Sequence, residues 1–201
     1  MLGGKGVILK YIDRPEAKTY LNIGSGSDKT ARFLIDRDKK VTDIDIKRTH
    51  SFKHENYSFI EWNLELGIPV GGFDVIIANH VLEHIRNTGI FLLGCNSALN
   101  DDGVLCIAVP PFKHALAGGH VHVFNMGILM YNLVLTGFNV VDGHFKKEGY
   151  NIIGIVKPRH DKLPKLNYDK GDIDILVRNG LLPSFFRQGM NGDMKMYNWI
   201  I

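Results

Sequence analysis

The sequence predicts an α/β fold: a Rossmann-like, doubly wound and mostly parallel seven-stranded sheet with helices on both faces. Three observations lead to this prediction. Segments with the apolar pattern of strands alternate along the chain with segments of helical spacing. The run Phe73–Ala78 is almost wholly apolar, as expected for a central parallel strand buried on both faces. Finally, Gly24 and Gly26 directly follow the apolar segment Thr19–Ile23, where glycine lets the backbone turn sharply toward a helix.

Strands and helices are expected to alternate along the chain. In the first half of the chain we expect a short leading strand at 6–12, a helix at 29–35, and strands at 19–23, 41–44, 58–61 and 73–78. In the second half we expect helices at 87–99 and 125–135, and strands at 104–109, 138–141 and 151–157. Gly137 is a favourable C-cap residue for the second of these helices. The polar stretch 142–149 is expected to be the connection between the last two strands.

The composition fits one globular domain. The chain has 201 residues, of which 45% are hydrophobic and 22% charged, enough for a sizeable core. A formal net charge of +3 is too small to indicate a nucleic-acid partner. Cys95 and Cys106 do not make a disulfide framework, and no apolar run reaches about 18 residues. We therefore expect a cytoplasmic protein with no membrane association.

We expect three parts along the chain: a leader segment at 1–16, the main domain at 17–157, and a C-terminal extension at 158–201. The extension contains two apolar runs, Leu181–Phe186 and Met196–Ile201, which are too apolar to be left in water. It is therefore expected either to pack on the domain or to form a homodimer contact.

Polar residues and glycines close several of the predicted strands. Gly24, Asp45, Asn63 and Asn79 each stand at a strand end, and ligands of such sheets lie beyond the carboxyl ends of the strands. The helix that begins after the glycine turn offers free backbone N–H groups to a polar ligand end. Asp45 follows that turn by about 20 residues, a position suited to hold a ribose hydroxyl pair. These features predict a nucleoside-cofactor site.

Two apolar residues complete this predicted site. Ile46 and Leu64 each come directly after one of its polar members, so they are placed to enclose an adenine ring. The sequence thus provides both polar and apolar contacts for a nucleoside.

The motifs resemble those of class I S-adenosylmethionine-dependent methyltransferases, the broad group with type 11 and type 12 methyltransferase domains. The resemblance covers roughly residues 17–157. The run Asn22–Asp28 resembles the family's strand followed by (Asp/Glu)-x-Gly-x-Gly-x-Gly, with departures at its first and last residues. Asp45 and Asn63 fall on the second and third motifs, and the run Phe73–His84 matches the fourth, Phe-Asp followed by Leu-Glu-His. The segment His120–Phe138 resembles a late His-x-x-x-Phe…Gly-Phe segment.

This resemblance implies S-adenosylmethionine as cofactor and S-adenosylhomocysteine as product. It implies that Asn22 hydrogen-bonds the methionine end and that the Asn63 carbonyl accepts from the adenine amino group. The full set of cofactor-binding residues that we predict is Asn22, Gly24, Ser25, Gly26, Asp45, Ile46, Asn63, Leu64 and Asn79.

The resemblance also places His84 and His120 on the side of the methyl acceptor. Methyl transfer is a direct displacement that depends mainly on alignment, because the sulfonium makes the methyl group intrinsically reactive. A hydroxyl acceptor needs a base as well, and either histidine is a candidate, whereas an amine or a carbanion needs less help. We expect a small molecule or glycan precursor that offers a sugar hydroxyl or an amine.

Three other interpretations use the same residues. The departures at Asn22 and Asp28 leave open a methyltransferase-like binding domain that has lost catalysis. An NAD-dependent oxidoreductase requires Gly-x-Gly-x-x-Gly, and Lys29 stands where its third glycine belongs. A zinc hydrolase matches His-x-x-Glu-His at His80–His84. However, His80 is expected in a turn after a buried strand and not on a helix, so we assign no metal ligand.

Overall fold

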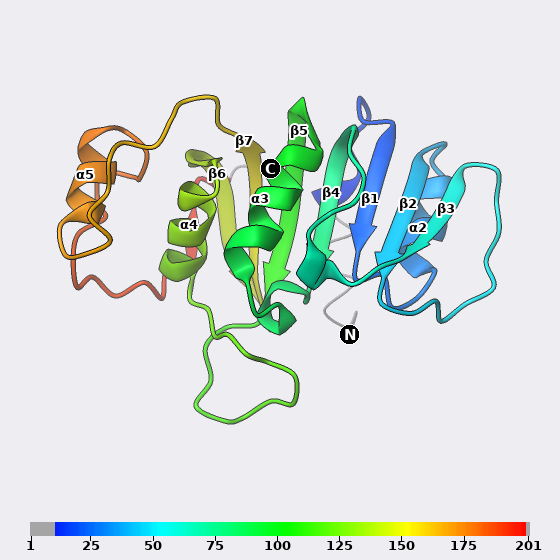
Figure 1. The fold of residues 1–201 in the computed structure, drawn as a ribbon, viewed down its shortest axis with the longest axis horizontal. Coiled ribbons are helices and arrows are strands. Elements are labelled where there is room, and N and C mark those ends of the chain that lie inside the picture. Colours follow the sequence, from blue (N-terminus) through cyan, green and yellow to red (C-terminus); the bar gives the residue numbers. More distant parts are fainter. Residues whose placement is uncertain (1–10, 200–201) are drawn as a thin grey trace.

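The computed structural model describes residues 11–199, which form one eight-stranded sheet in the order β3-β2-β1-β4-β5-β7-β6-β8 (Figure 1). The neighbouring pairs among β1 to β5 are all parallel, whereas β7 is antiparallel to both β5 and β6, and β8 is antiparallel to β6. The α/β class and the mostly parallel, doubly wound arrangement are therefore confirmed. The strands are β1 (Thr19–Ile23), β2 (Lys40–Asp45), β3 (Tyr57–Glu61), β4 (Phe73–Asn79), β5 (Leu99–Val109), β6 (Phe138–Glu148), β7 (Asn151–Pro158) and β8 (Met196–Tyr197).

Helices cover both faces of this sheet. In Figure 1, α3 and α4 lie in front of the sheet and α2 lies behind it. The strands serve both faces by alternation: in β4, Ile76 and Ala78 join the core under α3 and α4, whereas Val75 and Ile77 join the core that contains α2. The helices are α2 (Lys29–Ile35), α3 (Thr88–Ala98), α4 (Met126–Leu135) and α5 (Asp172–Arg178), with single 3-10 turns η1 (Leu64–Leu66) and η2 (Leu82–His84).

Asparagine side chains begin the two longest helices. The Asn87 side chain accepts from the backbone N–H of Ile90 at the start of α3. The Asn125 side chain accepts in the same way from Ile128 at the start of α4. Each bond satisfies one of the N–H groups that lack a partner inside a helix, which explains why the helices start where the sequence predicts.

The sheet differs from the prediction in its strand count and in its last hairpin. It has eight strands instead of seven, because Met196 and Tyr197 add the short β8 to the outer edge of β6. The stretch 142–149, predicted as a connection, mostly belongs to β6 and pairs with β7. Its polar side chains alternate with buried ones such as Phe145, so the segment reads as polar although it is a strand. The predicted leading strand at 6–12 falls largely outside the described residues, and Tyr11 and Ile12 have helical backbone.

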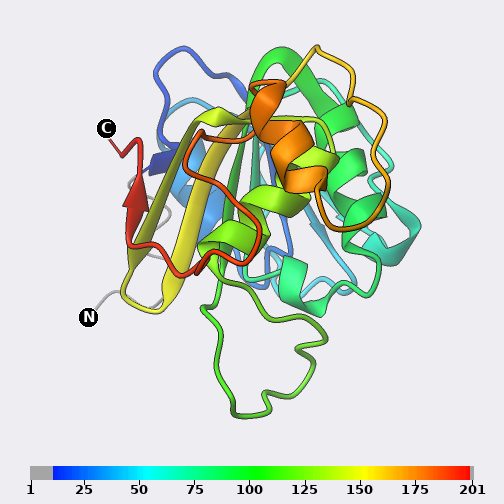
Figure 2. The ribbon, with the colours of Figure 1, turned by 90° about the vertical axis from the view of Figure 1, so that its left-hand side faces the viewer.

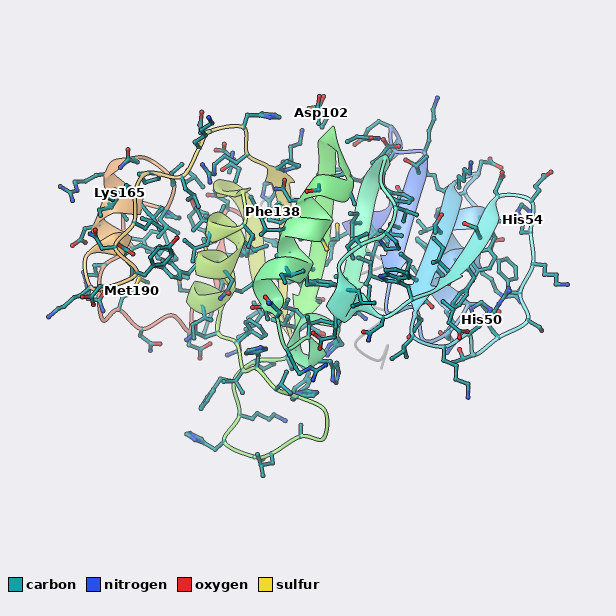
Figure 3. The ribbon with its side chains drawn as sticks, in the orientation of Figure 1. His50, His54, Asp102, Phe138, Lys165 and Met190 are labelled. Carbon is teal, nitrogen blue, oxygen red and sulfur yellow. The ribbon has the colours of Figure 1, made fainter. Side chains whose placement is uncertain are left out.

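The C-terminal segment after β7 packs on the rest of the molecule. Figure 2 shows α5 on the same side of the sheet as α4, and β8 at the outer edge. Lys165 and Met190 of this segment lie at the opposite end of the molecule from His50 and His54, which follow β2 (Figure 3). Its buried apolar residues belong to the core under α3 and α4: Leu176, Leu181, Leu182 and Phe186. Among the helices of residues 11–199, none is long and apolar enough to cross a membrane.

Candidate functional site

A cavity of about 390 Å³ opens where β1, β2, β3 and β4 end, and its lining comes from the loops that follow these strands. This volume lies within the range of small-molecule sites. The lining residues are Gly24, Asp45, Ile46, Trp62, Asn63, Leu64, Glu65, His80, Val81, His84 and Ile85. Five of the nine predicted cofactor-binding residues and one of the two predicted catalytic residues are thus gathered around one space.

Gly24 is required by its backbone conformation and by its surroundings. Its φ is +65°, a conformation that side chains disfavour, and Gly26 has a φ of +56°. A Cβ atom at position 24 would lie 2.4 Å from Cγ2 of Val81, in the loop that follows β4. The bare backbone at this turn therefore lets two loops of the cavity approach each other.

Asp45 ties the end of β2 to the glycine turn. One carboxylate oxygen accepts the backbone N–H of Gly26 at 2.8 Å, and the other accepts the backbone N–H of Ile46 at 2.7 Å. A carboxylate has about four acceptor sites, so both oxygens can accept further bonds from a ligand. The side chain is thereby held at the cavity wall with acceptor capacity to spare.

The loop after β3 supplies the apolar and amide groups of the cavity. The Asn63 side chain caps η1 by accepting from the backbone N–H of Glu65 at 3.1 Å, and its oxygen retains a second lone pair. Trp62 donates its ring N–H to the carbonyl of Gly67, which fixes the indole beside Asn63. Ile46 lines the same cavity and is 68% exposed, so its apolar surface is available to a ligand.

Asn22 does not reach this cavity. Its amide donates to Asp43 at 2.9 Å on the neighbouring strand β2, and both side chains are buried. Burial raises the pKa of Asp43 to about 6, although bonds from Asn22 and Tyr57 and the nearby His50 oppose the shift. An acid in place of Asn22 would set two buried carboxyl groups side by side, so at this position an amide is more favourable than the acid of the motif that the run resembles.

Ser25 and Asn79 are also buried and are not among the residues that line the cavity. Within residues 11–199, the Asn79 side-chain oxygen has no hydrogen-bond partner. Its position at the end of β4 agrees with the prediction, but its contact with a cofactor stays a prediction.

The side chains of His84 and His120 are in contact, although they come from the separate loops that follow β4 and β5. Their ring centroids are 4.8 Å apart and the rings are perpendicular. The Nδ1 atom of His84 lies 2.9 Å from the carbonyl oxygen of Gly119, so this nitrogen carries the proton and Nε2 is left as an acceptor. His120 lines a second cavity, of about 480 Å³, formed by residues 110–123 and Tyr150. The histidine pair therefore stands between two cavities.

Glu83 lies beside these two histidines, although it was not among the predicted site residues. The side chain is fully buried, and its Oε1 lies 3.1 Å from Nδ1 of His80 and 4.0 Å from Nε2 of His84. The Glu83 backbone carbonyl accepts from Val121 and His122, which holds the loop after β5 against η2. Its position in the Leu-Glu-His motif, directly before His84, was the signal in the sequence that could have indicated it.

His80 does not have the placement that a His-x-x-Glu-His metallohydrolase requires. It has a φ of +56° in the turn after β4, outside any helix, as expected from the sequence. Its Nε2 atom lies 2.7 Å from the side-chain oxygen of Asn151 at the start of β7. The ring is thus held between Asn151 and Glu83.

Other lining residues carry weaker signals in the sequence. Trp62, Glu65, Val81 and Ile85 stand next to predicted site residues, and only their position in these loops could have indicated them. His50, in the polar stretch after β2, is mostly buried, with Nε2 3.4 Å from the Tyr57 hydroxyl.

Solved structures of methyltransferases share this fold. Burkholderia thailandensis 1,6-didemethyltoxoflavin-N1-methyltransferase, solved with S-adenosylhomocysteine, is 18% identical, with 80% of this chain and 78% of that chain covered and a TM-score of 0.64. Human N-acetylserotonin methyltransferase, solved with SAM, is 16% identical, with a TM-score of 0.64 and 79% and 52% covered. This chain therefore spans about half of the human protein.

A chain in the complex between the Haloferax volcanii Trm112 methyltransferase activator and a putative methyltransferase gives a TM-score of 0.65 at 11% identity, with 80% and 90% covered. At such low identity these likenesses support the fold alone. No match was found among curated proteins. The sequence profile of a methyltransferase domain matches residues 6–141, which is more than half of the chain. The resemblance to class I S-adenosylmethionine-dependent methyltransferases is thus confirmed, and this chain belongs to the methyltransferase domain family.

Proposed function

We propose that this protein transfers a methyl group from S-adenosylmethionine to a small-molecule or glycan-precursor acceptor, with a sugar hydroxyl as the preferred group. The observation that carries the proposal is the pair of cavities separated by His84 and His120. The first cavity has the contacts that a nucleoside requires, and the second offers room for an acceptor.

In this proposal, the cofactor occupies the cavity at the ends of β1 to β4. Asp45 accepts the ribose hydroxyls, Ile46 and Leu64 enclose the adenine, and Asn63 accepts from the adenine amino group. The backbone N–H groups at the start of α2, which begins five residues after Gly24, suit the polar methionine end. The bound cofactor supplies an electrophilic methyl group on a positively charged sulfur.

The chain's own residues then align the acceptor and remove its proton. A bond forms between the acceptor oxygen and the methyl carbon while the carbon–sulfur bond breaks, leaving neutral S-adenosylhomocysteine. The hydroxyl proton must leave as this bond forms, and a neutral imidazole has a suitable pKa for that task near pH 7. Nε2 of His84 is the atom that takes this proton, because Nδ1 already donates to the Gly119 carbonyl.

Calorimetry with S-adenosylmethionine, S-adenosylhomocysteine and NAD tests the central claim. We expect both adenosyl ligands to bind in the micromolar range and NAD not to bind. Binding of NAD without any response to the adenosyl ligands would overturn the proposal. A methyl-transfer assay with a panel of sugars, phenols and amines then tests turnover. Cofactor binding without turnover on any acceptor would favour the interpretation of a non-catalytic binding domain.

A further inference from the structure

Three potential metal ligands converge beside the histidine pair. One donor atom each from Glu83, His84 and His120 lies within 4.8 Å of the other two. The first two residues belong to η2 and the third to the loop after β5, so the cluster exists only because the loops pack together. We propose that Glu83, His84 and His120 bind one divalent transition-metal cation at the acceptor side of the site.

The buried carboxylate is the first argument. Glu83 is fully buried, and among the described residues its Oε2 has no hydrogen-bond partner. A buried carboxylate oxygen without a partner destabilises the folded state, and a polar atom of this kind indicates an ion or a donor beside it. The other oxygen of this carboxylate, Oε1, lies 4.0 Å from Nε2 of His84, so the carboxylate and this nitrogen are close enough to contact one ion.

The orientation of the ligands is the second argument. His84 places Nδ1 against the Gly119 carbonyl, which leaves Nε2 free to bind a cation. A ligating histidine commonly donates its other ring N–H to a backbone carbonyl in this way. Oε1 of Glu83 is held at 3.1 Å by His80, which in turn is anchored by Asn151 at 2.7 Å. The ligands therefore already have the outer contacts that orient a metal site.

The distances fit after a small adjustment. Bonds of about 2.0–2.2 Å place two ligand atoms of one cation about 3–4.4 Å apart. The three donor atoms lie within 4.8 Å of one another, which exceeds this range by a few tenths of an ångström. The partly exposed side chain of His120 lies on a loop, so a small movement of this side chain can close the difference. Two imidazoles and one carboxylate favour Mn²⁺, Fe²⁺ or Zn²⁺ over Mg²⁺ and Ca²⁺, which prefer oxygen ligands.

This inference rests on the proposed function and specifies its acceptor chemistry. Three protein ligands leave open coordination positions, and a hydroxyl bound there becomes more acidic and loses its proton more easily. Its oxygen then attacks the methyl carbon, and the proton passes to solvent. The two histidines would thus act as ligands, and the cation would take the role of activating the hydroxyl.

The test measures cation binding without any methyl acceptor. Chelator-treated protein is titrated with Mn²⁺, Zn²⁺ and Mg²⁺ by calorimetry, and the Co²⁺-loaded protein is examined by visible absorption. We expect one transition-metal cation per chain and at least tenfold weaker binding of Mg²⁺. The variants Glu83→Gln and His120→Ala should each weaken Mn²⁺ binding at least tenfold and change the Co²⁺ spectrum. His160→Ala, which removes an exposed histidine after β7, should change neither.

The outcomes separate the two proposals. If the wild-type protein binds no cation, or if Glu83→Gln and His120→Ala bind it as tightly as the wild type, the metal site is wrong. Binding of S-adenosylhomocysteine by the chelator-treated protein is measured in parallel, because it tests the proposed function alone. Since Glu83 is buried and its variant risks misfolding, His120→Ala on the exposed loop provides the independent test.

Discussion

The two halves of the candidate site are built in different ways. In the cofactor half, Gly24, Asp45 and Asn63 each lie within two residues of the end of a parallel strand. In the acceptor half, His84 and His120 lie well beyond the ends of β4 and β5, and contacts between loops bring them together. The first half is positioned by the sheet itself, because parallel strands end along one edge. The second depends on how two loops pack.

This difference predicts that substitutions in the two halves affect different measurable properties. Changes in the cofactor half should alter cofactor affinity and the folding of the turn. Changes in the acceptor half should alter turnover and leave cofactor affinity nearly unchanged.

The largest effect is expected for His84→Asn. The asparagine amide can still donate to the Gly119 carbonyl, so the loop contact is retained while Nε2 is lost. Turnover should fall by about 10²–10⁴-fold, whether Nε2 takes the proton or binds a cation. The affinity for S-adenosylhomocysteine should stay within about twofold of the wild type, because His84 lies at the border between the two cavities and we expect its Nε2 to contact the acceptor. Calorimetry and a methyl-transfer assay measure the two quantities.

His160→Ala serves as the control for that experiment. Unchanged turnover of His84→Asn would indicate an acceptor that needs no activation, such as an amine. Loss of S-adenosylhomocysteine binding would place His84 in the cofactor half and break the comparison.

The sequence predicted the placement of Gly24 and Asp45 in the fold better than that of the loop residues around His84 and His120, for physical reasons. A strand that ends in an acid and a strand that ends in Gly-x-Gly can be recognised locally, and the parallel sheet then brings Gly24 and Asp45 together. Asn22 was predicted to contact the cofactor, but the structure pairs it with Asp43, a contact across two strands that spacing alone does not reveal. The partnership of Glu83 with His120 depends on the path of residues 110–124, which no periodic pattern fixes.

The next largest effect is expected for Gly24→Ala, at the contact between the two halves. The alanine would adopt a disfavoured positive φ, and its Cβ would lie 2.4 Å from Val81. We expect the free energy of unfolding to fall by about 3 kcal/mol, since backbone strain costs about 1–2 kcal/mol and overpacking adds about 1–3 kcal/mol. Denaturant unfolding measures this loss, and cofactor affinity should fall as well.

Two further variants separate strain from collision. Gly149→Ala has a similar φ of +58° with nothing within 4 Å of the added Cβ, so only the strain of about 1 kcal/mol should remain. Adding Val81→Ala to Gly24→Ala should restore part of the stability. If Gly24→Ala is no less stable than Gly149→Ala, the close contact between the loops is wrong.

Asp45→Ala should weaken cofactor binding by about 2–3 kcal/mol, because charge-assisted bonds to the ribose would be lost. The fold should persist, since the two backbone N–H groups that Asp45 accepts can bind water at this partly exposed position. Glu61→Ala is the matched control: Glu61 ends the neighbouring β3, opposite Asp45, and is exposed. Equal affinity of the Asp45→Ala variant and the wild type would remove Asp45 from the cofactor half. Asp43 could not replace it, because that side chain is buried away from the cavity.

The smallest effect is expected at Asp43, the buried carboxyl that accepts from Asn22. Burial raises the pKa of Asp43 from 3.8 to about 6 in the folded protein, so the folded state binds more protons than the unfolded state between these values. This contribution to stability is largest at low pH and disappears as the pH rises through the folded pKa. As the pH rises from about 5 to about 7, the loss of the proton from Asp43 should therefore lower the free energy of unfolding by about 1 kcal/mol. Asp43→Asn should remove this decrease, as measured by denaturant unfolding at several pH values.

Asp74 provides a control of opposite sign. Burial tends to raise its pKa, but N–H donors from Lys18 and Thr19 and bonds from the Asn100 and Thr19 side chains outweigh burial and lower it. Its contribution is present at neutral pH and is lost as the pH falls through the folded pKa. Relative to the wild type, Asp74→Asn should thus lower the free energy of unfolding more at pH 7 than at low pH. Relative to the wild type, Asp43→Asn should be more favourable for stability at pH 7 than at pH 5. If Asp43→Asn leaves the pH dependence unchanged, Asp43 is not a buried carboxyl, and the pairing that keeps Asn22 out of the cavity would be wrong.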